Sequence, residues 1–75
     1  KEYKAGDFEA AVEALTKAVA YDAGNQDAYF NLGNAYRKLE RTGEAIETYQ
    51  KVIELFPSSS IANRSQSYIN DLKNN

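Results

Sequence analysis

The sequence predicts an all-α protein built from helix hairpins that repeat along the chain, and three observations lead to this prediction. A shift of 34 residues aligns the chain with itself, and a fixed period of this kind identifies a repeat architecture. Apolar residues recur at helical rather than alternating spacing. Turn and capping residues separate the apolar stripes by only a few positions. Short loops between amphipathic helices give antiparallel hairpins that stack side by side.

The 34-residue shift matches charged and apolar positions alike. The shift aligns Glu13 with Glu47 and Lys17 with Lys51, and each of these pairs is identical. The apolar positions match in character, pairing Ala11 with Ala45, Val12 with Ile46, Leu15 with Tyr49, Ala18 with Val52, and Val19 with Ile53. We therefore expect two equivalent amphipathic helices in these two segments.

Two further helices are expected, one between the equivalent pair and one after Pro57. The stripe of the first consists of Tyr29, Leu32, Gly33, Tyr36 and Leu39, and that of the second of Ile61, Ala62, Tyr68, Ile69 and Leu72. Breaks between helices are expected at Gly6-Asp7, Gly24-Asn25, Thr42-Gly43 and Pro57-Ser58-Ser59-Ser60, which offer capping or helix-stopping chemistry.

The segment from Gln26 to Ser59 resembles a tetratricopeptide repeat, whose 34-residue pattern is W-x2-L-G-x2-Y, then A-x3-F, then P. The matching positions here are Tyr29, Leu32, Gly33, Tyr36, Ala45, Tyr49 and Pro57, with aromatic exchanges at the first and sixth. The resemblance implies a short right-handed superhelix of stacked antiparallel hairpins. Gly33 and Ala45 are small so that the two helices of a hairpin can approach closely.

The repeat pattern divides the chain into three parts. Residues 1–25 form a partial repeat that lacks most of its first helix, residues 26–59 a complete repeat, and residues 60–75 a polar capping helix. When the apolar stripe of the helix after Gln26 is shifted by 34 residues, it falls on polar residues of this last helix. They are Asn63, Gln66, Ser67, Asn70 and Lys73. Ala62 and Ile69 can still pack backward, so we expect the array to end here.

The composition argues against several classes of function. The formal net charge is -2, which gives no broad positive field for nucleic acid. Cysteine and histidine are both absent, so the commonest metal ligands and the commonest general base near neutral pH are missing. We expect no catalytic residue, no metal and no cofactor, and hence not an enzyme.

Three polar groups have a structural rather than a chemical explanation. The loop Asp22–Asp27 lacks the spacing and terminal glutamate of a calcium loop, so we interpret it as a turn with helix caps. Ser58–Ser60 precedes a helix, where serine is the expected cap. Glu44, Glu47 and Glu54 fall opposite the apolar stripe and face solvent.

The candidate binding surface lies opposite the core stripe of the helix that follows Gln26. The resemblance implies that the first helix of each repeat lines a concave wall, which amide, basic and aromatic side chains would make suitable for a peptide. Phe30 is expected on this solvent side as a large apolar residue. The candidate residues are Tyr3, Lys4, Asp27, Phe30, Asn31, Asn34, Arg37, Lys38, Arg64 and Tyr68.

Some members of the family hold acidic chaperone tails with a carboxylate clamp, and the likeness here is partial. Asn31 and Asn34 stand where that clamp uses asparagines. Phe30, Ile61 and Ser65 replace its basic residues. The sequence therefore does not predict chaperone-tail binding.

The leading function is an adaptor or scaffold module that binds a protein or peptide, and the alternative is self-assembly. In the alternative, the face left uncovered by the partial first repeat pairs with another copy or exchanges a helix with it. The candidate self-association residues are Phe8, Val12, Leu15 and Val19.

Localisation is left open between the cytoplasm and the periplasm. No apolar run approaches the ~20 residues that span a bilayer, so we expect a soluble segment that does not insert into membranes. The Phe56-Pro57-Ser58 ending with its polar cap is similar to terminal repeats of bacterial cell-envelope assembly proteins, which favours a bacterial origin.

Overall fold

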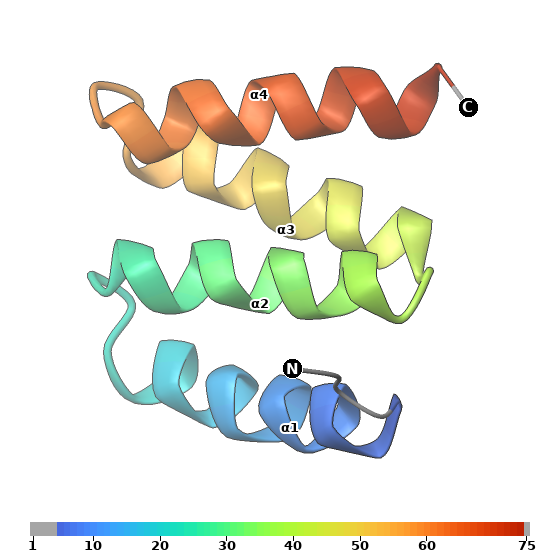
Figure 1. Ribbon diagram of the computed structural model, residues 1–75. Helices are drawn as coiled ribbons and strands as arrows, with labels where there is room; N and C mark the ends of the chain where they lie inside the picture. The colour runs from blue at the N-terminus through green and yellow to red at the C-terminus, as the bar shows by residue number, and fades with distance from the viewer. Residues whose placement is uncertain (1–4, 75) are drawn as a thin grey trace.

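The computed structural model describes residues 5–74, which form four α-helices. They are α1 (Ala5–Tyr21), α2 (Gln26–Lys38), α3 (Thr42–Leu55) and α4 (Ser60–Lys73). Figure 1 shows the helices side by side in chain order, each antiparallel to the one before. Each helix packs on the next, and α2 also reaches α4. The predicted all-α class and sequential hairpin packing are confirmed.

The polar loops start two of the helices, as the sequence predicts. The Asn25 side-chain oxygen accepts a hydrogen bond from the Ala28 amide at 3.0 Å and so caps α2. The Ser59 hydroxyl accepts one from the Ala62 amide at 3.0 Å and so caps α4. Such caps satisfy backbone donors that the first turn of a helix leaves unpaired.

Two of the four expected breaks are wrong. Gly6-Asp7 lies inside α1, and Thr42-Gly43 forms the first turn of α3. The chain turns instead at Glu40, which has a φ of 61° in the left-handed region. A non-glycine residue in that region costs roughly 1–2 kcal/mol, so the surrounding contacts must hold it there.

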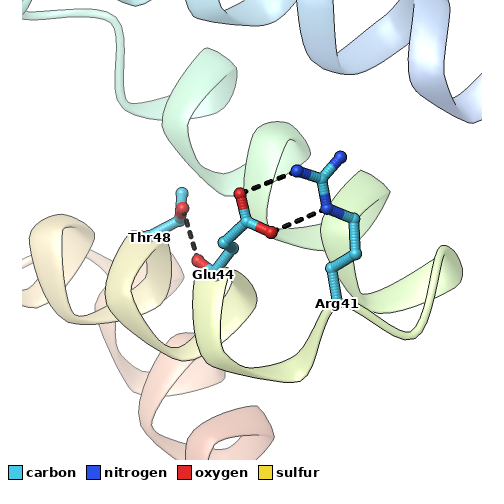
Figure 2. Close-up of polar contacts among 3 residues, drawn as sticks. All are labelled: Arg41, Glu44 and Thr48. Carbon is cyan, nitrogen blue, oxygen red and sulfur yellow. Dashed lines mark hydrogen bonds and ion pairs between the residues drawn. The ribbon is translucent and has the colours of Figure 1, made fainter.

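An exposed ion pair joins Arg41 and Glu44 at the start of α3 (Figure 2). The Arg41 guanidinium donates from Nε to Glu44 Oε1 at 2.7 Å and from Nη2 to Glu44 Oε2 at 2.9 Å. The Thr48 hydroxyl donates to the Glu44 carbonyl at 2.8 Å. Because Glu44 lies in the first turn, its negative charge also suits the positive end of the helix dipole.

Helices α2 and α3 approach each other closely where Gly33 faces Tyr49. An ideal Cβ placed on Gly33 would lie 2.7 Å from Cε1 of Tyr49, closer than van der Waals contact allows. Tyr49 is fully buried, as are Ala45 and Val52 on the same helix. The predicted need for a small residue at Gly33 is therefore confirmed, and its partner in the contact is the Tyr49 ring.

The two faces of α4 differ as the sequence predicts. Ala62 and Ile69 are buried against the preceding helices, with 4% and 2% of their surface exposed. The polar residues on the outer side are all exposed, namely Asn63, Gln66, Ser67, Asn70 and Lys73. Within residues 5–74 no helix has both the length and the apolarity that crossing a membrane requires.

Gly33→Ala should destabilise the protein by roughly 1–3 kcal/mol, because the added methyl group overlaps a buried aromatic ring that has no room to move. The unfolding free energy from urea titration measures the change. Gly43→Ala is the matched control, since nothing lies within 4 Å of a Cβ at that position. It should be neutral or stabilising by about 0.5–1 kcal/mol, because alanine is the better helix former. Equal effects of the two variants would contradict the packing role of Gly33.

Candidate partner-binding surface

The Tyr49 side chain crosses from the core to the polar face of α2. Its hydroxyl donates a hydrogen bond to Asn34 Oδ1 at 2.5 Å and accepts one from Arg37 Nε at 3.2 Å. Both partners lie on α2, one turn apart. A tyrosine buried at its ring end and hydrogen-bonded at its hydroxyl is held at both ends. The hydroxyl therefore fixes the two polar side chains relative to the core.

Three aromatic rings from three helices pack around this hydrogen-bonded group. The centroid of the Tyr49 ring lies 5.9 Å from that of Phe30 and 5.4 Å from that of Tyr68. Phe30 and Tyr68 also stack on each other, with their ring centroids 5.9 Å apart. These separations are in the range where aromatic pairs attract beyond their burial alone. We call Phe30, Asn34, Arg37, Tyr49 and Tyr68 the Tyr49 cluster.

Arg37 is held from two sides within this cluster. Besides its hydrogen bond to Tyr49, its guanidinium carbon lies 4.5 Å from the centroid of the Tyr68 ring, a cation–π contact. Within residues 5–74 Arg37 forms no ion pair with a carboxylate, whereas Arg41 is paired with Glu44. The result is a positively charged planar group in a fixed position on a half-buried surface.

The expected position of Phe30 on the solvent side is wrong. The side chain is 9% exposed and belongs to the core cluster with Ala45, Tyr49 and Ile69. A projection of α2 alone puts Phe30 opposite the stripe that faces α3, but α2 also contacts α4. Phe30 fills the space between these two neighbours and therefore supports the surface instead of presenting an apolar group to a partner.

The other candidate residues fall into three groups. Asp27, Asn31, Lys38 and Arg64 are exposed. Asn34, Arg37 and Tyr68 are half-buried and meet in the Tyr49 cluster. Tyr3 and Lys4 lie outside the described residues.

The repeat pattern places Tyr49 only among the apolar positions of its helix. Tyr49 stands where the repeat pattern has phenylalanine, and this difference is the sequence signal for a role on the polar surface. A buried hydroxyl requires a hydrogen-bond partner. Asn34, which the sequence already placed on the polar face, supplies one.

A second feature of the surface is an apolar hollow of about 230 Å³ between α1 and α2. It is lined by Phe8, Ala11, Leu15, Asn31, Asn34, Ala35 and Lys38, and we call it the α1–α2 hollow. Two of the four candidate self-association residues, Phe8 and Leu15, thus line a concavity, while Val12 and Val19 do not. All four are half-buried.

The described residues offer no gathering of ligands for a metal ion: between residues 5 and 74 no three acidic side chains come together. In the loop before α2, the Asp22 carboxylate accepts a hydrogen bond from the Gly24 amide at 3.0 Å, and Asn25 caps the helix. The oxygen atoms of this loop therefore serve the turn.

Comparisons with known proteins agree with the repeat pattern. The family model described as "Tetratricopeptide repeat" matches residues 2–60. Two curated relatives, the "Peptidyl-prolyl cis-trans isomerase FKBP4" proteins of Mus musculus and Rattus norvegicus, are 34% identical over 55 residues, which is 73% of this chain. The chain spans only 12% of the length of these relatives. The isomerase activity in their name is therefore not transferred to it.

The Tyr49 hydroxyl should make stability depend on pH at the alkaline end. Burial raises the pKa of Tyr49 above its ordinary value of 10.0, although the hydrogen bond and charge of Arg37 oppose the shift. A raised pKa in the folded state gives a contribution to stability that is fully present below the unfolded-state pKa near 10 and is lost as the pH rises through the folded-state pKa. Tyr49→Phe should therefore show a shallower loss of stability above pH 10.

The measurement is the unfolding free energy across the range from pH 8 to about 12 for the unmodified chain, Tyr49→Phe and Tyr21→Phe. Tyr21 is the matched control because it is 95% exposed. At neutral pH the Tyr49 variant should lose about 1–2 kcal/mol, since Asn34 and Arg37 lose their shared partner. Parallel curves for the three proteins would show that the Tyr49 hydroxyl is not held as described.

Proposed function

Because the chain belongs to the tetratricopeptide repeat family, whose modules bind other proteins, we propose that it binds a carboxylate-bearing peptide segment of a partner on the face that carries Arg37. This face corresponds to the concave wall that the first helix of each repeat lines in such arrays. The chain acts as an adaptor or scaffold, and no chemical step is assigned to it.

The observation that supports this proposal is the position of Arg37. Its guanidinium is held by Tyr49 and Tyr68, and a group that is already ordered loses little side-chain entropy when it binds. A carboxylate suits its planar donors, because arginine can bind both oxygens at once. Lys38 and Arg64 are exposed and add positive charge, Lys38 directly after Arg37 at the end of α2 and Arg64 on α4.

The remaining side chains of this face suit an extended peptide backbone. The Asn31 amide is exposed and offers both donors and acceptors. Asn34 already accepts from Tyr49 through its oxygen, which leaves its side-chain amide donors for a ligand carbonyl. The basic side chains of this face bind the acidic side chain of the peptide, and the asparagine amides bind the peptide backbone.

Self-assembly through Phe8, Val12, Leu15 and Val19 is the second candidate. Its support is the α1–α2 hollow, which Phe8 and Leu15 line together with other residues of α1 and α2. Sedimentation of the chain over a concentration series distinguishes the two, because a groove that binds peptides needs no second copy. The proposed three-part division of the chain, with residues 60–75 as a cap, applies to both.

The first experiment measures binding of a fluorescent peptide containing three glutamates by anisotropy, in the unmodified chain and in Arg37→Ala. Loss of one charge-assisted hydrogen-bond pair is worth about 1.5–3 kcal/mol, so affinity should fall by roughly 10- to 100-fold. Lys51→Ala is the control, since Lys51 is an exposed cation on α3.

The peptide with glutamine in place of each glutamate gives a second comparison. It should bind the unmodified chain as weakly as the glutamate peptide binds Arg37→Ala. The proposal fails if Arg37→Ala and Lys51→Ala bind the glutamate peptide equally, or if glutamine serves as well as glutamate.

A further inference from the structure

A further hollow lies between α2 and α3, away from the Tyr49 cluster. It has a volume of about 180 Å³ and is lined by Tyr29, Leu32, Glu47, Thr48 and Lys51. No residue of the Tyr49 cluster lines it. Both of its walls come from helices that are described from end to end, and Figure 1 shows α1 and α4 on their outer sides. We call it the α2–α3 hollow.

The side of the hollow that α2 forms is apolar. Leu32 is 7% exposed, and Tyr29 is half-buried with its ring centroid 6.1 Å from that of Phe56. The Thr48 hydroxyl already donates to the Glu44 carbonyl. Pockets for small molecules usually measure about 300–1,000 Å³, so a hollow of this size suits a single side chain better than a whole small molecule. The lining favours a large apolar side chain as the occupant.

Glu47 also lines a second hollow, which runs along the exposed face of α3. This second hollow measures about 300 Å³ and is lined by Glu47, Gln50, Lys51 and Glu54. Its lining thus holds two carboxylates and one ammonium group. Within residues 5–74 neither Glu47 nor Glu54 forms an ion pair, whereas the Glu44 carboxylate is paired with Arg41. Glu47 therefore places an uncompensated negative charge next to the α2–α3 hollow.

Charge is distributed unevenly between the helices. Helices α1 and α3 carry six carboxylates and two ammonium groups, whereas α2 and α4 carry two carboxylates and four cations. The six carboxylates belong to Asp7, Glu9, Glu13, Glu44, Glu47 and Glu54, and the four cations to Arg37, Lys38, Arg64 and Lys73. The proposed peptide-binding face lies on α2 and α4 and attracts anions. The surface of α3 presents the opposite sign of charge and attracts a cationic partner.

We propose that the α2–α3 hollow binds a large apolar side chain from a basic segment of a second partner protein, and that Glu47 binds an arginine next to that side chain. A guanidinium suits a carboxylate because its planar donors can bind both oxygens at once. The proposal goes beyond the proposed function. It gives the chain an acidic ligand on α2 and a basic ligand on α3, so that one small module joins two partners.

A second copy of this chain offers a poorer ligand. The exposed large apolar residues of the described part are Tyr21 and Leu55. Each has an acidic neighbour in sequence, Asp22 and Glu54, and no arginine adjoins either of them. Glu47 repels such carboxylates. A basic segment of another protein therefore complements this surface better than a second copy does.

The test uses a fluorescent peptide that has one leucine between two arginines in a chain of glycine and serine, which we call the leucine peptide. Two comparison peptides replace the leucine by alanine, or both arginines by glutamine. In an anisotropy titration the unmodified chain should bind each comparison peptide roughly 10-fold more weakly than the leucine peptide. The first comparison removes the apolar side chain from the hollow, and the second removes the charge that pairs with Glu47.

Reversing the charge of Glu47 tests the carboxylate from the side of the protein. Glu47→Lys should weaken binding of the leucine peptide roughly 10-fold, and it should prefer the same peptide with glutamate in place of each arginine. Glu13→Lys is the matched control, because the 34-residue shift aligns Glu13 with Glu47 and Glu13 is exposed on α1 without lining the hollow. It makes the same change in net charge and should stay within about 2-fold.

A third variant fills the hollow. Thr48 lines it and is half-buried, so Thr48→Leu places a larger side chain where the apolar residue of the partner binds. Affinity for the leucine peptide should fall roughly 10-fold. Thr16→Leu is the matched control, as the same change at an exposed position of α1 that does not line the hollow. Circular dichroism checks that both variants fold, and the alanine peptide tests the hollow without any change to the protein.

Three results would overturn the proposal. They are equal binding of the leucine and alanine peptides, including no binding of either, equal weakening by Glu47→Lys and Glu13→Lys, or a dimer of the unmodified chain that Thr48→Leu converts to a monomer. The last result would assign the hollow to a second copy. Arg37→Ala separates this proposal from the proposed function, because it should weaken binding of the peptide with three glutamates while leaving the leucine peptide within about 2-fold.

Discussion

The contact between the Gly33 backbone and the Tyr49 ring sets the spacing of the central hairpin and the position of its polar surface. It lets α2 and α3 approach closely enough to bury Ala45 and Val52 completely. The ring lies across the interface and carries its hydroxyl to the other side of α2, where Asn34 and Arg37 meet it. One side chain thus belongs to the packed core at one end and to the polar surface at the other.

Because of this geometry, the stability of the hairpin and the order of the binding surface depend on the same residue. A buried hydroxyl is costly when unpaired, so Tyr49 favours the arrangement in which Asn34 and Arg37 point toward it. Tyr68 then covers the guanidinium from the side of α4. The fixed position of Arg37 is a consequence of core packing and requires no contact from a ligand. The two repeats differ here, because Leu15 stands where the complete repeat has Tyr49 and has no hydroxyl with which to organise a polar group. The α1–α2 hollow therefore has an apolar floor.

The fold could be predicted from the sequence because its determinants are local and periodic. The caps Asn25 and Ser59 and the small residue Gly33 each fulfil the role that residue chemistry assigns them. The errors arise where a residue responds to more than one neighbour. The periodicity of one helix predicts a solvent-facing Phe30, whereas α2 packs on both α3 and α4 and buries it between them. Glu40 adopts the left-handed conformation at the end of α2, where backbone hydrogen bonds from the Arg41 amide to the Tyr36 carbonyl and from the Glu40 amide to the Arg37 carbonyl close the turn.

The packing order of the helices has a consequence for α1. This helix packs on α2 alone among the described helices, and no residue from Gly6 to Tyr21 is fully buried. Elements with few buried contacts open locally at a lower free energy than the rest of a protein. A ligand that contacts both α1 and α2 binds only while the two helices are packed together, so by linkage its binding energy suppresses that opening. Occupancy would then be detected as hydrogen-exchange protection spreading into α1, and the ligand would help to hold together the site to which it binds.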